Sequence, residues 1–216
     1  MKRAFSLIEL VFTIVIMAGI FSVIPKIMST VNKSDSFATK QEAFFNAISL
    51  TNIASYLAWD ENNTVSMSIL ETNSTTIPCD STTHLRAGGF LGSFSRNCKE
   101  HFTASTIGSD GESDYLSFND IDDFNSSPAI DVNIGGKTKY KIHTQVRYLS
   151  DTIFTSVVNQ KMNITLDNST QTSTTNIKKF KAIIEYIGKR GKDKNISSFY
   201  YYSTNIGQMQ LNSRSW

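Results

Sequence analysis

The chain has 216 residues, which is enough for one ordinary domain and a long accessory element. Hydrophobic residues make up 40% and charged residues 19%, as in folded proteins, and 3 prolines leave long helices and strands few interruptions. The formal net charge of +2 argues against a strongly basic nucleic-acid-binding protein, although it leaves room for a local basic patch.

The first predicted element is a membrane-spanning helix over residues 5–25. Its apolar part, Phe5–Ile24, contains a single charged residue, Glu9. A helix of that length measures about 30 Å, which is the thickness of the hydrocarbon core of a bilayer. Lys2 and Arg3 precede it, so the positive-inside rule predicts a cytoplasmic N-terminus and an exported remainder. The run is too long for an ordinary secretory signal and lacks a small-x-small cleavage site.

Glu9 is the unusual residue of this segment, because a charge at the centre of a membrane helix costs on the order of 3 kcal/mol. Such a residue usually marks a specific partner. The stretch "KRAFSLIELVFTIVIMAGIFSVIP" resembles the class III signal of type IV prepilins and type II secretion pseudopilins. In that family a short basic leader and a small residue precede the cleaved bond, a Phe follows it, and a Glu stands fifth after it.

The resemblance implies that prepilin peptidase removes residues 1–4 as a leader peptide. The cut would fall between Ala4 and Phe5, and the same enzyme would N-methylate Phe5. Ala4 stands where the family usually has Gly, so we expect cleavage at reduced efficiency. Cleavage removes two basic residues and leaves 19 basic and 19 acidic side chains. Glu9 would then pair with a Phe5 amine, either its own or, as the family implies, that of a neighbouring subunit.

Residues 26–59 contain no Gly or Pro and are predicted to continue this helix onto a globular domain, ending at 60–63. A break near Pro25, with a restart after Ser34, is the alternative, because Pro25 lacks the N–H that would bond the carbonyl of Phe21. Large apolar side chains on or near one helical face are predicted to pack in the core: Phe37, Phe44, Phe45, Ile48, Tyr56 and Trp59.

Residues 60–216 are the predicted periplasmic globular domain, and its first part, 60–112, is a loop-rich connection. Cys79 and Cys98 lie in this connection with 18 residues between them. In an oxidising compartment we expect them to form a disulfide. Closing a loop of that length stabilises a fold by roughly 3 kcal/mol in the chain-entropy model. Two buried free thiols are the alternative.

The second half of the chain is predicted to form strands. In "KTKYKIHTQVRYL" apolar and cationic residues alternate, which is typical of a strand with one buried face. Strands are also predicted at "IKKFKAIIEYIG" and "SSFYYYST", with shorter ones at Tyr115–Phe118 and Thr152–Val158, a turn at 188–194 and a polar loop or hairpin tip at 161–176. Strands in one block after a helix predict an α+β fold, with the long helix packed on an antiparallel sheet as a pilin-like roll.

Signals for chemistry are weak. The three histidines (His84, His101 and His143) accompany no nucleophile signature, HExxH motif or phosphate-binding loop, so we expect no enzyme. Asp120, Asp122 and Asp123 in "NDIDDFN" could offer oxygen ligands to calcium. That stretch lacks the glycine and the closing glutamate of an EF-hand, so the favoured interpretation is a solvated turn with capping carboxylates and no cofactor.

Seven basic residues form a predicted patch that could contact DNA phosphates: Lys178, Lys179, Lys181, Lys189, Arg190, Lys192 and Lys194. Lysines are also common on exposed strands and turns, where they discourage edge pairing, and this is the favoured interpretation.

The sequence therefore predicts a minor pilin or pseudopilin, an assembly subunit of a type IV pilus, type II secretion or DNA-uptake filament. Its expected partners are prepilin peptidase, other pilin or pseudopilin subunits, an inner-membrane assembly platform and membrane lipid. We expect a single-pass protein of the bacterial inner membrane with a periplasmic C-terminal domain, found in the extracellular filament after assembly. The alternative is a membrane-tethered periplasmic adhesion or DNA-binding domain that works without cleavage.

Overall fold

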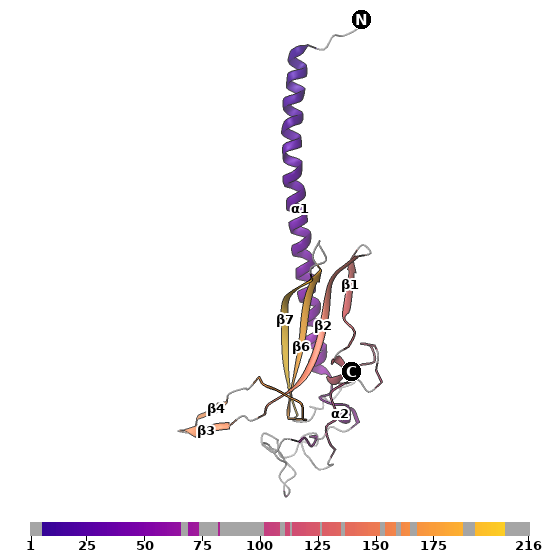
Figure 1. Cartoon of the computed structure of the whole chain (residues 1–216), viewed down its shortest axis with the longest axis vertical. Helices are drawn as coiled ribbons and strands as arrows, with labels where there is room; N and C mark the ends of the chain where they lie inside the picture. The colour runs from indigo at the N-terminus through magenta and orange to yellow at the C-terminus, as the bar shows by residue number, and fades with distance from the viewer. Residues whose placement is uncertain are drawn as a thin grey trace, which may run out of the picture. The chain divides into compact units, whose positions relative to one another are not determined.

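The computed structural model shows an α+β fold with a long N-terminal helix and an antiparallel sheet (Figure 1). It divides into two compact units, 1–44 and 45–216. The residues that the structure describes are 6–65, 69–73, 82, 102–108, 111–112, 114–125, 127–134, 137–151, 154–158, 161–164, 168–187 and 193–205.

Helix α1 (Leu7–Tyr56) runs for 50 residues and continues through Pro25 without a break. The predicted alternative of a break and restart is therefore wrong. By length and composition α1 is able to cross a membrane. The helix ends three residues before the predicted end at residue 59, and the short helix α2 (Glu61–Val65) follows. The carboxylate of Asp60 accepts a hydrogen bond from the backbone N–H of Asn62, which caps the start of α2.

The face of α1 that is buried in the second unit carries alanines and a leucine, not aromatic side chains. Ala47, Leu50 and Ala54 are buried and lie on one face by helical spacing. Asn46 on this part of α1 donates a hydrogen bond of 2.6 Å to the hydroxyl of Tyr140 in the sheet. The predicted aromatic core face is wrong, because the large side chains of that set are exposed or half-buried apart from Trp59: Phe37, Phe44, Phe45, Ile48 and Tyr56. Small side chains allow the backbone of the helix to approach its neighbours closely.

The main sheet has the strand order β1-β2-β6-β7 (Figure 1). A further short strand, β5, pairs with the end of β2. Every pair is antiparallel. The strands of this sheet are β1 (Ile130–Ile134), β2 (Lys137–Leu149), β5 (Thr170–Gln171), β6 (Ile177–Ile187) and β7 (Asp193–Thr204). A separate two-stranded ribbon consists of β3 (Phe154–Val158) and β4 (Lys161–Ile164).

The three long strands and β3 confirm the predicted strands, and two other predictions fail. Residues 115–117 form a turn instead of a strand. The predicted loop 161–176 contains β4 and β5. Both are short, with four and two residues, so neither is long enough for alternation to identify a strand.

The alternation predicted for β2 and β6 is confirmed by burial. The inward side chains of β2 are buried at every second residue from Tyr140 to Tyr148, and those of β6 at Phe180, Ala182 and Ile184. The core continues into the 3-10 turn η1 (Asp122–Phe124), where the ring of Phe124 meets that of Phe180 edge-on at 5.4 Å. The sheet thus has one buried face and one face that carries polar and charged side chains.

Candidate functional site

Glu9 lies in the first turn of α1 and closes a local hydrogen-bonded ring. The backbone N–H of Ser6 donates to Glu9 Oε2 at 3.2 Å, and the N–H groups of Glu9 and Leu10 donate to the Ser6 carbonyl at 3.0 and 3.2 Å. The bond from Ser6 to Glu9 is one of the two reciprocal hydrogen bonds of a capping box. In that motif, a glutamate three residues after the N-cap residue accepts a hydrogen bond from the backbone N–H of the N-cap residue. The stretch "SLIE" carries the S-x-x-E signal for it.

The capping box gives Glu9 a role at the helix start that the sequence reasoning missed. Ala4 and Phe5 lie outside the described residues, so the expected pairing of Glu9 with a Phe5 amine stays a prediction. The expected disulfide also stays a prediction, because Cys79 and Cys98 lie outside the described part of the chain.

Lys178 is fully buried, which corrects its predicted place in a surface patch. It stands on the inward side of β6, and its Nζ donates to three oxygens: the Trp59 carbonyl at 2.7 Å, Asp60 Oδ2 at 3.0 Å and Asp122 Oδ2 at 2.6 Å. The ring of Trp59 lies 3.9 Å from Nζ, measured to the ring centroid. A cation–π contact therefore adds to the two ion pairs around the ammonium group.

Asp120, Asp122 and Asp123 are buried, so the prediction of a solvated turn is wrong, although the predicted capping is present. Asp120 Oδ1 accepts the N–H groups of Asp122 and Asp123 at 2.7 and 3.1 Å. Asp123 Oδ2 accepts those of Asn119 and Asp120 at 3.0 and 3.3 Å. Within the described residues no group of three or more His, Cys, Asp or Glu side chains is arranged to hold a metal ion.

Burial gives two of these carboxyl groups unusual proton affinities. It raises the pKa of Asp120 to about 8, and repulsion from Asp122 and Asp123 acts in the same direction. Burial also raises the pKa of Asp122 to about 7, although attraction to Lys178 opposes the shift. Asp60 is buried in the same cluster, where it and Asp122 both pair with the ammonium group of Lys178. The cluster therefore retains protons near neutral pH.

This buried cluster connects three parts of the second unit: the segment after α1, the turn η1 and strand β6. Tyr148 of β2 closes one side, with its ring 6.2 Å from that of Trp59 and its hydroxyl donating to the carbonyl of Ser105 at 3.1 Å. Burial, with nearby carboxylates, raises the pKa of Tyr148, so the phenol stays a neutral donor. All the charged groups are sealed from solvent, so we assign the cluster a structural role.

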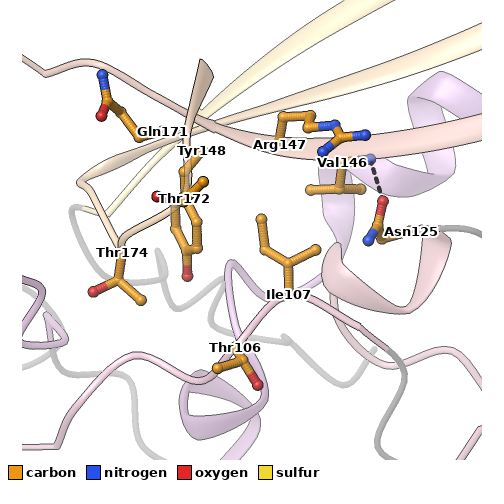
Figure 2. A pocket seen from close by; sticks show the side chains of 9 residues that line it. All are labelled: Thr106, Ile107, Asn125, Val146, Arg147, Tyr148, Gln171, Thr172 and Thr174. Atoms are coloured by element: carbon orange, nitrogen blue, oxygen red, sulfur yellow. Dashed lines mark hydrogen bonds between the residues drawn. The ribbon is translucent and has the colours of Figure 1, made fainter.

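A cavity of about 310 Å³ lies beside the C-terminal end of β2 (Figure 2). Its lining is mostly neutral and polar, and the single charged side chain in it is that of Arg147. The N–H of Val146 donates to Asn125 Oδ1 at 3.2 Å on one wall. The lining residues are Thr106, Ile107, Asn125, Val146, Arg147, Tyr148, Gln171, Thr172 and Thr174. These side chains offer hydrogen bonds but no carboxylate, imidazole or thiol that could act as a general base.

The rest of the predicted basic patch divides between the sheet and the undescribed part of the chain. Lys179 and Lys181 lie on the outward side of β6 and are half-buried, and Lys194 at the start of β7 is exposed. Lys189, Arg190 and Lys192 lie outside the described residues, as do His84 and His101. His143 Nε2 lies 2.8 Å from Glu185 Oε2 on the neighbouring strand.

Comparison with family models, with curated proteins and with solved structures finds no match to this chain. Its function is therefore inferred from its own residues and their geometry.

Proposed function

We propose that this chain is a minor pilin or pseudopilin, an inner-membrane-anchored assembly subunit of a type IV filament machine. The observation that carries the proposal is the position of Glu9, a carboxylate in the first turn of an unbroken helix able to span a membrane. The prepilin-like stretch "RAFSLIEL" around it supplies the cleavage signal. The second unit, with an antiparallel sheet beside the last turns of the helix, is compatible with a pilin-like roll.

The proposed mechanism is an exchange of partners by Glu9. Cleavage after Ala4 creates an ammonium group on Phe5, and the Glu9 carboxylate of one subunit attracts the Phe5 ammonium of the next. In a low-dielectric environment this attraction offsets part of the cost of burying both charges. Head-to-tail contacts of this kind repeat without closing, so they build a helical filament.

Processing is the first test of the proposal. The full chain is produced in cells with and without prepilin peptidase, and its N-terminus and intact mass are measured. We expect the peptidase to remove residues 1–4 and to add one methyl group to Phe5. The matched control is Ala4→Lys, which places a charged side chain before the cut and is expected to block it. A wild-type chain that stays uncut with an active peptidase would remove the pilin proposal and favour a membrane-tethered periplasmic domain.

The charge of Glu9 can be separated from its capping role, because glutamine retains the oxygen that accepts the Ser6 N–H. We expect Glu9→Gln to be cleaved and inserted like wild type but to be strongly depleted from purified filaments. Glu9→Ala loses both the charge and the capping hydrogen bond. Its difference from Glu9→Gln therefore measures how much the capping of the helix contributes to entry into filaments. Quantitative immunoblots of sheared filaments and of membranes measure the distribution. Entry of Glu9→Gln into filaments at the wild-type level would contradict the proposed ion pair.

A further inference from the structure

The outward face of the sheet carries aromatic and cationic side chains in matched rows across three strands. In one row Arg147 of β2 pairs with Lys179 of β6, which pairs with Tyr202 of β7. In the next row Gln145, Lys181 and Tyr200 are paired in the same way. Residues paired across strands project from the same face, so these six side chains form one patch, which we call the Tyr–Lys face.

The two tyrosines of this face are exposed, unlike the tyrosines of the sheet core. The exposed fraction is 47% for Tyr200 and 38% for Tyr202, whereas Tyr140 and Tyr148 are buried. Tyr200 and Tyr202 are two residues apart on one strand, so their rings project from the same side about 7 Å apart. Exposed aromatic rings at a fixed spacing on a rigid sheet form a surface on which flat ligands can stack.

Lysine ammonium groups lie over both rings in cation–π contacts. Lys179 Nζ lies 4.6 Å from the ring centroid of Tyr200 and 5.8 Å from that of Tyr202, and Lys181 Nζ lies 5.6 Å from that of Tyr200. Asn168 Oδ1 accepts from the Tyr202 hydroxyl at 3.1 Å and from Lys179 Nζ at 3.4 Å. These contacts hold the ammonium groups against the tyrosine rings.

The hydroxyl of Tyr200 is also polarised by its surroundings. The Ser198 hydroxyl donates to the Tyr200 hydroxyl at 2.9 Å. This bond, with the positive charge of Lys181 and Lys179, lowers the pKa of Tyr200. The field around the ring therefore favours negative charge.

The outward face of this end of the sheet carries a net positive charge, because the described acidic side chain on these strands lies elsewhere. Among the described outward side chains of β2, β6 and β7, the acidic one is Glu185, which is paired with His143. Glu185 is four residues from Lys181 along β6, so it lies two rows away from the Tyr–Lys face. Arg147, Lys179 and Lys181 therefore present three positive charges that no described carboxylate on this face neutralises at close range.

We propose that the Tyr–Lys face binds single-stranded nucleic acid, with Tyr200 and Tyr202 stacking on two successive bases and Arg147, Lys179 and Lys181 contacting the phosphates. Stacking and cationic contacts are the two interactions by which proteins hold single strands without reading sequence. The ring spacing is about twice the 3.4 Å rise of a stacked strand, so the bound strand must be unstacked and extended. A duplex cannot adopt that form while its bases stay paired, so the face selects single strands. The inference does not depend on cleavage after Ala4.

Binding is tested with the full chain in zwitterionic detergent, using the fluorescence anisotropy of a labelled short oligothymidylate at low salt. The stacking of one base on an aromatic ring contributes substantially to the binding free energy. We therefore expect Tyr200→Ala and Tyr202→Ala each to weaken binding by about fivefold or more. Phenylalanine at either position retains the ring and is expected to retain most of the affinity. The matched control is Tyr56→Ala, which removes an exposed tyrosine from α1 and is expected to change nothing.

The cationic contribution is measured from the dependence of affinity on salt. For a single strand the slope of log K against log salt changes by about 0.7 for each phosphate contact. We expect Lys179→Gln and Lys181→Gln each to reduce the slope by about that amount. Lys194→Gln, an exposed lysine at the opposite end of β7, is expected to leave the slope unchanged. Circular dichroism verifies that each variant is folded.

Three results would overturn the proposal. The first is no binding of the oligothymidylate at low salt, or binding that both Tyr→Ala variants leave intact. The second is a duplex of equal length that binds as tightly as the single strand. The third is an acidic polysaccharide that binds through the same residues while the oligothymidylate does not, which would assign the face to a different class of polyanion.

Discussion

Lys178 shows how a single side chain can organise the second unit. Its ammonium group donates hydrogen bonds to the Trp59 carbonyl and to the carboxylates of Asp60 and Asp122. These partners lie 119, 118 and 56 residues away in the sequence, respectively. Removing one partner of a buried ion pair leaves an uncompensated charge and is strongly destabilising. The cluster therefore fixes the end of α1, the turn η1 and strand β6 in one arrangement, because any other arrangement would leave its charges without partners.

Asp120 predicts how stability depends on pH. Its pKa is about 8 in the folded chain and near its ordinary value of 3.8 when unfolded, so the folded state binds this proton more tightly. Stability from Asp120 is therefore fully present below about pH 4 and is lost as the pH rises through 8. Asp122, with a pKa of about 7, acts in the same direction. At about 1.4 kcal/mol per pKa unit, the free energy of unfolding falls by several kcal/mol across that range.

Asp120→Asn tests this dependence, because asparagine keeps the oxygen that caps Asp122 and Asp123 but does not titrate. We expect the variant to be more stable than wild type near pH 9 and to have a flatter stability profile from about pH 5 to about pH 9. Chemical unfolding followed by tryptophan fluorescence provides the profile. Asp114→Asn, at an exposed carboxyl, is the control and should retain the wild-type slope. An unchanged profile in Asp120→Asn would contradict the raised pKa.

At the scale of single residues, the sequence alone identifies Glu9 as unusual but does not reveal that Lys178 is buried. Glu9 stood out because a charge in an apolar run is rare. Lys178 is separated from Phe180 and Ala182 by even numbers of residues, so all three side chains project from the same, buried face of β6. It was assigned to the surface because lysine is rarely buried without a partner, and both carboxylate partners are distant in sequence.

At the scale of elements, the helix and the long strands were predictable because each follows a local rule. A long apolar run favours the first half of α1, the absence of Gly and Pro from residue 26 onward favours its second half, and strict alternation identifies β2 and β6. The buried face of α1 was not predictable from hydrophobicity, because apolar character ranks Phe45 above Ala47 while the structure buries the alanine. Which face is buried depends on how closely the helix and the sheet approach each other, and that is a tertiary property.

The buried alanines predict that α1 tolerates added volume poorly. Ala47→Leu places three further carbons in a fully buried position, and overpacking of a filled core costs roughly 1–3 kcal/mol. Phe45→Ser, two residues earlier on an exposed face, is expected to change stability by less than about 0.5 kcal/mol. Chemical unfolding of both variants in detergent measures the difference. A larger loss in Phe45→Ser than in Ala47→Leu would mean that the aromatic face of α1 forms the core after all.

At the scale of the whole molecule, apolar surface is distributed unevenly between the two units. The large apolar side chains from Leu7 to Val31 are exposed, whereas large apolar side chains that are buried lie in the second unit: Leu50, Trp59, Ile69, Leu70, Phe124, Phe180 and Ile184. An exposed apolar surface of that extent on a soluble protein marks a membrane or protein interface. The first part of α1 therefore adds no described core contacts and needs lipid, detergent or other helices as its surroundings.

This distribution predicts that a chain starting at residue 29 is soluble and folded. It lacks most of the exposed apolar side chains of α1 and retains the part of the helix that carries Asn46, Ala47, Leu50 and Ala54. We expect the shortened chain to leave the membrane fraction and to unfold cooperatively, with a midpoint close to that of the full chain in detergent. Circular dichroism follows the helix and the sheet, and the fluorescence of buried Trp59 reports the ion cluster. If the shortened chain is soluble but has no cooperative transition, the first part of α1 is needed for folding. If it stays in the membrane fraction, a surface outside residues 7–28 binds the bilayer, and the assignment of the anchor to the first half of α1 is wrong.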